Sequence, residues 1–189
     1  MRPYLLLDVD GMFNNLAAVS NVELRERLQF QGWVSELITI SSRGTFRVTV
    51  NPAAGQWVLD LAAETGAELA WGTTWNHWAN QHIGPLLGLP ELPVAPVRGR
   101  DKAATVVPWT DGRPFVWLDD DPDLPYAVKR MTEATGQRGC VLQTDPCIGL
   151  TRRDILDARV LLRRAQHEEQ VQIVKEIAAE HMQDWHDSQ

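Results

Sequence analysis

The chain has 189 residues, a formal net charge of −7 and 44% apolar residues. This length and apolar content suit one hydrophobic core with appendages. The acidic balance argues against broad, non-specific binding to a nucleic-acid backbone. No apolar run approaches the length of a membrane span, and no segment has the order of a signal peptide. We therefore expect a cytoplasmic protein with no membrane partner.

The N-terminal apolar run Tyr4–Leu7 is followed closely by two acids, Asp8 and Asp10, and by Gly11. The run is typical of a buried parallel strand, and the glycine allows the backbone to turn sharply after it. Two carboxylates at a strand end repel each other unless a cation binds there, and Mg²⁺ is commonly held by one or two carboxylates. An acidic turn without a metal is the alternative.

Two later strand-like runs, residues 67–72 and 114–118, also lead into polar residues. These are Thr73 and Thr74 after the first run, and Asp119 and Asp120 after the second. Lys102 stands at the start of a short predicted helix, with Asp101 as its predicted N-cap. Because parallel strands end at one edge of a sheet, we expect these side chains to surround one crevice.

Strands and helices are predicted to alternate along most of the chain. After the first strand we predict a helix from Asn51-Pro52 to the residue before Gly66, the Thr73 strand, a helix around 76–87, a short strand near 92–97, the Lys102 helix, the Asp119 strand, a helix over about 122–135 and a strand over 139–143. Such alternation predicts a parallel sheet covered on both faces. Residues 1–150 are thus predicted to form a Rossmann-like α/β core.

The segment over residues 16–51 is predicted to be an insert with a different character. Residues 35–40 and 45–50 are strand-like and flank the turn residues 41–44, which predicts a β-hairpin. Because it follows the first strand directly, the hairpin is expected to lie as a flap above the crevice. It is too small to form a closed lid, so an open site that admits a large substrate is expected. The alternative is that the hairpin merely extends the sheet.

A C-terminal helical extension is predicted over residues 151–189. Thr151 and Asp154 have the spacing of a helix capping box, with Asp in place of Glu. The apolar positions that follow form two stripes that face different surfaces: Ile155, Ala158, Leu162 and Ala165, then Val171, Val174, Ala178, Met182 and Trp185. The first stripe is expected to pack on the core. The second is expected to bend away or to form a homodimer, with an exposed tail as the alternative.

The ordered set of Asp-x-Asp-Gly, a strand-end Thr, a Lys and an acidic strand end resembles the haloacid dehalogenase (HAD) superfamily of phosphohydrolases. The resemblance spans residues 4 to about 145. Within the superfamily the chain is most similar to the short-insert HAD domain of Swiss Army Knife RNA-repair proteins, and also to the phosphatase half of polynucleotide kinases. It implies a three-layer α/β/α fold and a hydrolase acting on phosphate monoesters.

The resemblance also implies roles for individual residues. Asp8 is expected to be the nucleophile and Asp10 the general acid and then base, with Thr73 and Lys102 contacting the phosphoryl group. The implied cofactor is Mg²⁺, with four expected ligands: Asp8, Asp10 through its main-chain carbonyl, Asp119 and Asp120. Asp120 is the first choice over Asp119 as the direct ligand.

Further residues are candidates for substrate contacts: Gly11, Thr74, Trp75, Arg98 and Arg100. Trp75 lies just beyond a strand, where an exposed ring would stack on a nucleobase, a contact that contributes about 1–3 kcal/mol; core packing is its alternative. The two arginines are candidates for contacts with backbone phosphates, or else solvated charges. Arg43 at the flap tip is expected to be a solvated charge.

Three functions are consistent with these features. The first is a Mg²⁺-dependent phosphomonoesterase that acts through an aspartyl-phosphate on a nucleotide or nucleic-acid end, as in nucleic-acid repair. The second is a phosphatase of the same type for a small metabolite, which the acidic charge favours. The third is a non-catalytic binding or assembly module of the same fold. The four intact motifs favour a phosphatase over the third function, and of the two phosphatases we prefer the first.

Overall fold

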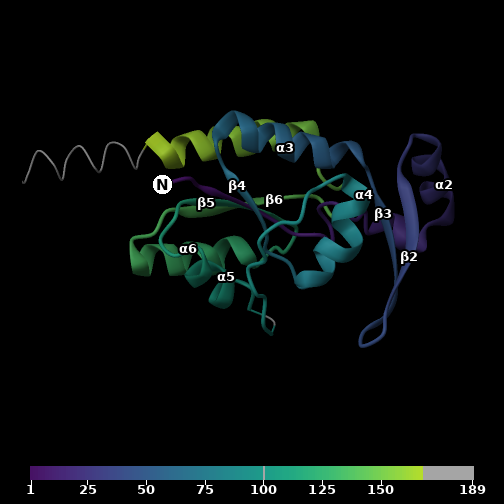
Figure 1. The fold of residues 1–189 in the computed structure, drawn as a ribbon, viewed down its shortest axis with the longest axis horizontal. Helices are drawn as coiled ribbons and strands as arrows, with labels where there is room; N and C mark the ends of the chain where they lie inside the picture. The colour runs from purple at the N-terminus through teal and green to yellow at the C-terminus, as the bar shows by residue number, and fades with distance from the viewer. Residues whose placement is uncertain (100, 168–189) are drawn as a thin grey trace, which may run out of the picture.

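The computed structural model describes residues 1–99 and 101–167. Its centre is a parallel sheet of four strands in the order β4–β1–β5–β6 (Figure 1). The strands are β1 (Tyr4–Leu7), β4 (Glu68–Trp71), β5 (Phe115–Asp119) and β6 (Gly139–Gln143). Every pair is parallel, and β1 lies between β4 and β5. The first strand of the chain is therefore central, as a continuous apolar run predicts.

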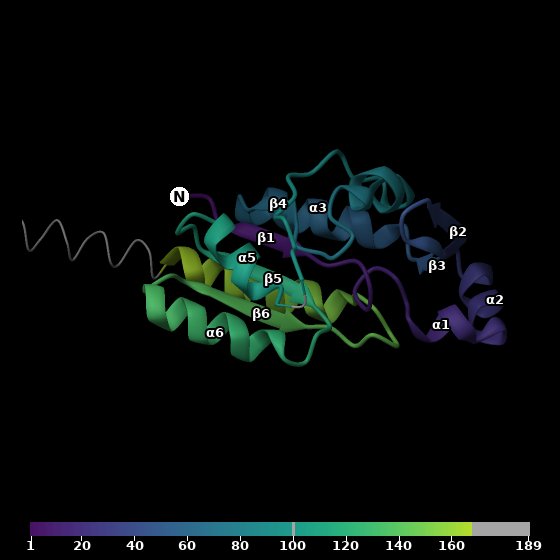
Figure 2. The ribbon, with the colours of Figure 1, turned by 90° about the horizontal axis from the view of Figure 1, so that it is seen from below.

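Helices cover both faces of the sheet (Figures 1 and 2). One face carries α3 (Ala53–Thr65) and a helix over residues 152–167; the other carries α5 (Ala103–Trp109) and α6 (Leu124–Thr135). Two separate clusters of buried apolar side chains lie on the two sides. The predicted three-layer α/β/α fold is confirmed.

Helix ends follow the predicted local signals. The Asn51 side chain accepts a hydrogen bond from the Ala53 N–H at 3.1 Å, and α3 ends at Gly66 in the left-handed conformation. At the start of the C-terminal helix, Asp154 accepts bonds from the Thr151 N–H at 2.8 Å and the Thr151 hydroxyl at 2.6 Å. The predicted capping box is therefore formed.

The described part of the C-terminal helix packs against α3. Its residues Ile155, Ala158 and Leu162 are buried in the same core as that helix. On the surface, Arg159 and Arg163 form ion pairs with Glu64 at 2.9 and 2.7 Å. The second apolar stripe and the predicted homodimer contact lie outside the described residues.

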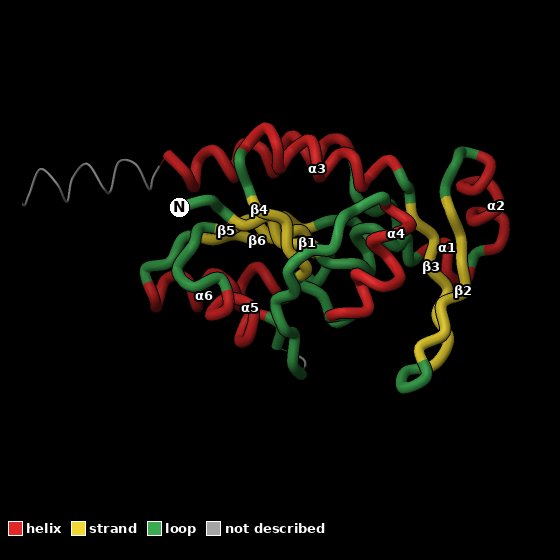
Figure 3. Tube along the Cα trace, viewed as in Figure 1, coloured by secondary structure: helices red, strands yellow, loops and turns green. Residues whose placement is uncertain are grey.

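The insert after β1 contains two short helices, α1 (Ala17–Ser20) and α2 (Val22–Phe30), and a hairpin of β2 (Val34–Ile40) and β3 (Gly44–Val50). The hairpin is its own antiparallel sheet, so it does not extend the main one (Figure 3). The two helices were not predicted. Within α2 only Leu28 is buried, so the sequence has no apolar period to indicate a helix.

In the segment after β4 one prediction is confirmed and one is wrong. The helix predicted around residues 76–87 is present over 77–87, and its middle is a π-helical segment, η1 (Ala79–Ile83), before α4 (Gly84–Leu87). The strand predicted near residues 92–97 is wrong, because only one isolated bridge joins Val94 to Trp71. Prolines at positions 90, 93 and 96 lack the N–H donors that a strand needs. No helix among the described residues is long and apolar enough to cross a bilayer.

Candidate active site

Three neighbouring strands deliver polar side chains to one edge of the sheet. Asp8 follows β1 directly, Asp119 ends β5 and Thr73 lies two residues beyond β4. Because these strands are parallel and adjacent, their carboxyl ends open onto the same crevice. The predicted gathering of motifs is therefore observed.

Lys102 joins two of these acids. Its ammonium donates to Asp8 Oδ2 at 2.9 Å and to both oxygens of Asp119, at 3.0 and 2.8 Å. The two carboxylates are almost fully buried, with 3% and 0% of their residue surface exposed. The Thr73 hydroxyl lies beside Asp8, where it lowers the pKa of that carboxyl against the larger effect of burial. The buried Asp8 carboxylate thus faces a cation and a hydroxyl group.

Burial and mutual repulsion shape the titration of this group. Desolvation raises the pKa of Asp8, and desolvation together with the Asp8 charge raises the pKa of Asp119 to about 7. The same two causes raise the pKa of Asp120. Desolvation alone would lower the pKa of Lys102, but the charges of Asp8 and Asp119 outweigh it and raise that pKa. The cluster therefore has more negative charge than one lysine balances.

The donor set suits a divalent cation. Asp8, Asp119 and Asp120 each offer an oxygen within 4.8 Å of the others. Lys102 contacts both oxygens of Asp119, and one of these also accepts the Asp121 N–H at 3.0 Å. Asp8 and Asp120 are accordingly better placed than Asp119 as direct ligands. Hard oxygen donors and a surplus of negative charge are what Mg²⁺ requires.

Gly11 makes room for Asp120. It has a φ of +68°, and a Cβ at this position would lie 2.2 Å from the Asp120 Cγ. Its N–H donates to the Asn14 carbonyl oxygen at 3.0 Å. The Gly11 N–H is therefore occupied, and the residue serves the turn and the close approach of the acid; its predicted contact with substrate stays a prediction.

The Asp10 carboxylate belongs to a different environment from Asp8. Its Oδ2 accepts the Trp75 indole N–H at 2.9 Å, and its Oδ1 accepts the Asn14 side-chain N–H at 2.8 Å. In the described part of the chain it is not one of the clustered acids. Asp8 and Asp10, which are separated by one residue, thus have different kinds of partner. The Asp8 carboxylate contacts a cation, and the Asp10 carboxylate contacts neutral N–H donors.

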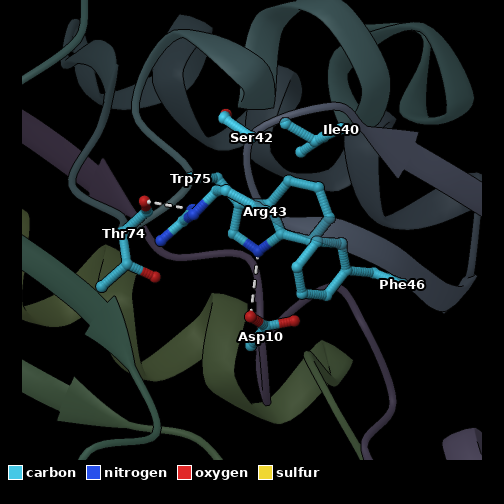
Figure 4. A pocket seen from close by; sticks show the side chains of 7 residues that line it. All are labelled: Asp10, Ile40, Ser42, Arg43, Phe46, Thr74 and Trp75. Carbon is cyan, nitrogen blue, oxygen red and sulfur yellow. Dashed lines mark hydrogen bonds between the residues drawn. The ribbon is translucent and has the colours of Figure 1, made fainter.

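A cavity of about 360 Å³ opens beside Asp10, between the hairpin and the loop after β4 (Figure 4). It is lined by Asp10, Ile40, Ser42, Arg43, Phe46, Thr74 and Trp75. The hairpin tip reaches across to this loop, since the Arg43 guanidinium donates to the Thr74 carbonyl oxygen at 3.0 Å and lies 5.1 Å from the Trp78 ring centroid. Arg43, expected to be solvated, is exposed but also bridges flap and loop.

Comparison with known proteins agrees with this geometry. The family model described as the HAD domain in Swiss Army Knife RNA repair proteins matches residues 4–155. The chain belongs to this family. The resemblance recognised in the sequence motifs is confirmed, and the site described above is the crevice of a HAD domain.

Solved structures share the fold at low sequence identity. The HAD domain of the effector protein Lem4 from Legionella pneumophila is 12% identical, with a TM-score of 0.51 over 85% of this chain and 97% of that domain. An inactive mutant of the same domain gives a TM-score of 0.51 at 12% identity, over 87% of this chain and 97% of that domain. At this identity the likeness shows the fold alone. No curated protein sequence matches the chain significantly.

The remaining predicted substrate contacts of this HAD domain have different outcomes. Thr74 lines the cavity. Trp75 also lines it, but only 4% of its surface is exposed, so the prediction of an open stacking ring is corrected. Arg98 is exposed on the loop before α5, and Arg100 lies outside the described residues.

Sequence reasoning missed Asn14 and Phe46. Asn14 is the fourth residue after Asp10, outside the Asp-x-Asp-Gly motif, and no sequence signal marked it. Phe46 packs against Trp75 with ring centroids 5.7 Å apart. The apolar residues of the hairpin mark its buried face, but they do not reveal which partner Phe46 meets.

Gly11→Ala should destabilise the domain more than Gly66→Ala. Both glycines have a φ of +68°, but an added Cβ at Gly66 has no heavy atom within 4 Å, whereas at Gly11 it collides with Asp120. The backbone strain is matched, so the difference measures the collision, and overpacking costs about 1–3 kcal/mol. Urea unfolding of the two variants measures it. Equal losses would contradict the close approach of Asp120 to the turn.

Proposed function

We propose that this HAD domain is a Mg²⁺-dependent phosphomonoesterase that acts through an aspartyl-phosphate. The observation that carries the proposal is the Lys102 bridge between Asp8 and Asp119, with Thr73 on the same carboxylate and Asp10 beside an open cavity. Family membership supports a phosphohydrolase. A site built only for binding would not require a nucleophile and a separate proton-transfer group one residue apart.

In the first step an Asp8 carboxylate oxygen attacks phosphorus while the bond from phosphorus to the leaving oxygen breaks. Asp10 donates its proton to that oxygen, so an alcohol departs and the phosphoryl group stays on Asp8. Lys102 and Thr73 lie beside Asp8, where their N–H and O–H groups can bond the phosphoryl oxygens. These donors offset the negative charge that otherwise repels a carboxylate nucleophile.

In the second step a water molecule attacks phosphorus and Asp10 takes its proton. The bond from phosphorus to Asp8 breaks, which releases inorganic phosphate and restores both carboxyl groups. Mg²⁺, held by Asp8 and Asp120 with Asp119 beside them and the Asp10 main-chain carbonyl as a fourth donor, would supply charge screening for the phosphoryl group. Lys102 orients Asp8 for attack in the first step and lies beside the oxygen released from phosphorus in the second.

Asp8→Asn should abolish hydrolysis while the domain stays folded, because the amide keeps the shape of the side chain but loses the attacking anion. A phosphate-release assay with the parent and the variant, together with their melting temperatures, measures this. Turnover within about tenfold of the parent, which is less than about 1.4 kcal/mol in the barrier, would rule out the covalent mechanism.

Chelation should remove activity, and added Mg²⁺ should restore it and raise the melting temperature. A ligand that binds only the folded state stabilises it by about 2.7 kcal/mol at a hundred times its Kd. The melting shift should be lost in Asp120→Asn and kept in Asp60→Asn, a control at an exposed acid on α3. An identical shift in all three proteins would place the metal elsewhere.

For the substrate we propose a nucleotide or a nucleic-acid end. The family description names RNA repair proteins. A second cavity of about 370 Å³ adjoins the first and shares Asp10, Phe46 and Trp75 with it. Arg43 borders one cavity and Arg47 the other. A substrate crossing Asp10 under the flap would meet a cation on each side.

The small-metabolite alternative is favoured by a different observation. Each cavity alone has the volume of a small-ligand pocket. The net charge of −7 also opposes long anionic substrates. The two proposals therefore differ in one expectation. For a nucleic-acid end, contacts between the arginines and parts of the substrate beyond the phosphoryl group should increase the rate of hydrolysis; for a small metabolite they should not.

An oligonucleotide with a terminal phosphate should have a higher kcat/KM than a free sugar phosphate. Added salt and Arg43→Ala should both reduce the ratio of the two values, because remote charge contacts position the reacting group. Arg130→Ala is the control, since this residue stacks over Tyr126 on α6, away from the cavity. A ratio at or below one that salt and Arg43→Ala do not change would favour the small metabolite.

A further inference from the structure

Both oxygens of Asp10 are held by side-chain N–H donors from different parts of the chain. Trp75 Nε1 donates to Oδ2 at 2.9 Å, and Asn14 Nδ2 donates to Oδ1 at 2.8 Å. Figure 4 shows the indole nitrogen directed at the Asp10 carboxylate, beside the Phe46 ring. A carboxylate bonded once would rotate about its Cβ–Cγ bond, whereas one bonded at both oxygens has its plane defined.

The Trp75 donor has little freedom. Its ring is 4% exposed and packs against Phe46, and the indole N–H is the only hydrogen-bonding group of the side chain. The backbone at Trp75 is also constrained, because its N–H donates to the Thr73 hydroxyl oxygen at 3.3 Å. The indole is thus held by the same loop that positions Thr73.

The Asn14 donor is oriented by the flap. Its side-chain oxygen accepts the Thr49 backbone N–H of β3 at 2.9 Å. Because the backbone N–H can only donate, the amide oxygen must face Thr49, and the amide nitrogen must face Asp10. Asn14 is 3% exposed, which leaves it no competing partner in solvent. Strand β3 therefore reaches Asp10 by two routes, through Thr49 and Asn14 and through Phe46 and Trp75.

We propose that Trp75 and Asn14 are positioning residues that orient Asp10 for proton transfer to the leaving group. The proposal rests on the phosphomonoesterase function proposed above. A general acid acts only when its proton lies within hydrogen-bond reach of the departing oxygen, and correct placement contributes about 10²–10⁴-fold in rate. Neither residue touches the reacting atoms. Their effect passes through the orientation of Asp10.

Proton transfer matters most for a basic leaving group. An alkoxide needs a proton as it departs, whereas a nitrophenolate leaves readily without one. Loss of Asp10 positioning should therefore slow hydrolysis of an alkyl phosphate and spare that of p-nitrophenyl phosphate. The quantity to measure is the ratio of kcat/KM for glycerol phosphate to that for p-nitrophenyl phosphate. This constant covers the steps through departure of the leaving group, so slow hydrolysis of the aspartyl-phosphate does not obscure it.

Trp75→Phe removes the N–H but keeps an aromatic ring against Phe46. We expect Trp75→Phe to lower the ratio at least tenfold. Asp10→Asn removes the proton donor altogether, so its ratio is the lowest value that loss of positioning can reach. Trp57→Phe is the matched control, because this half-buried tryptophan on α3 stacks under Arg152, away from the site, and should leave the ratio unchanged. Equal losses on both substrates in Trp75→Phe would show a merely structural role and overturn the proposal.

Asn14→Asp provides a second variant if Trp75→Phe does not fold. It keeps the size of the side chain and an acceptor for the Thr49 N–H, but it presents an oxygen in place of the N–H that faces Asp10. The same selective loss on the alkyl phosphate is expected, and an unchanged ratio would overturn the proposal. A parent enzyme inactive on both substrates and on an oligonucleotide with a terminal phosphate would instead contradict the proposed function itself.

Discussion

The ion pairs of Lys102 with Asp8 and Asp119 are the interaction on which the rest of the site depends. Two nearly fully buried carboxylates at the ends of adjacent strands would repel each other without a cation between them. Removing one partner of a buried pair typically costs about 3–5 kcal/mol, because it leaves an uncompensated charge. The lysine precedes α5, so the pairs also tie that helix to the edge of the sheet.

The crevice is completed by packing around that pair. The Trp117 indole N–H on β5 donates to the Gly72 carbonyl oxygen at 3.1 Å, and a Cβ at Gly72 would lie only 3.0 Å from the Trp117 ring. The loop after β4 is thereby held against β5, which places Thr73 beside Asp8. Gly11 acts in the same way on the other side by admitting Asp120. Two glycines thus allow Thr73 and Asp120 to lie close to Asp8.

Local signals in the sequence predicted the helices and strands of the core. The sequence could not predict which side chains far apart in the chain contact each other. The caps at Asn51 and Thr151 depend on residues two or three positions away, so the sequence shows them directly. The bond from Trp75 to Asp10 joins residues 65 positions apart. Sequence alone left Trp75 between stacking and core packing, because nothing local records that its N–H meets a carboxylate.

The same distinction applies to the site as a whole. Asp8, Thr73, Lys102 and Asp119 were predicted together because parallel strands deliver their ends to one edge. Asn14 was missed because its role depends on the register of β3, whose Thr49 N–H orients the amide. The sequence also could not predict that the hairpin forms a separate sheet. The alternation of apolar and polar residues in its strands is equally consistent with strands added at the edge of the main sheet.

In the proposed mechanism Asp8 and Asp10 have two different chemical roles, and their surroundings differ accordingly. Asp8 is bonded to an ammonium, whose charge favours the ionised form that the proposed nucleophile needs. Asp10 is instead bonded to two neutral N–H groups, those of Asn14 and Trp75. Different surroundings of neighbouring carboxyl groups are the feature by which acid–base roles are assigned. Here the difference lies in their partners, which are Lys102 at the sheet edge for Asp8, and Trp75 and Asn14 for Asp10.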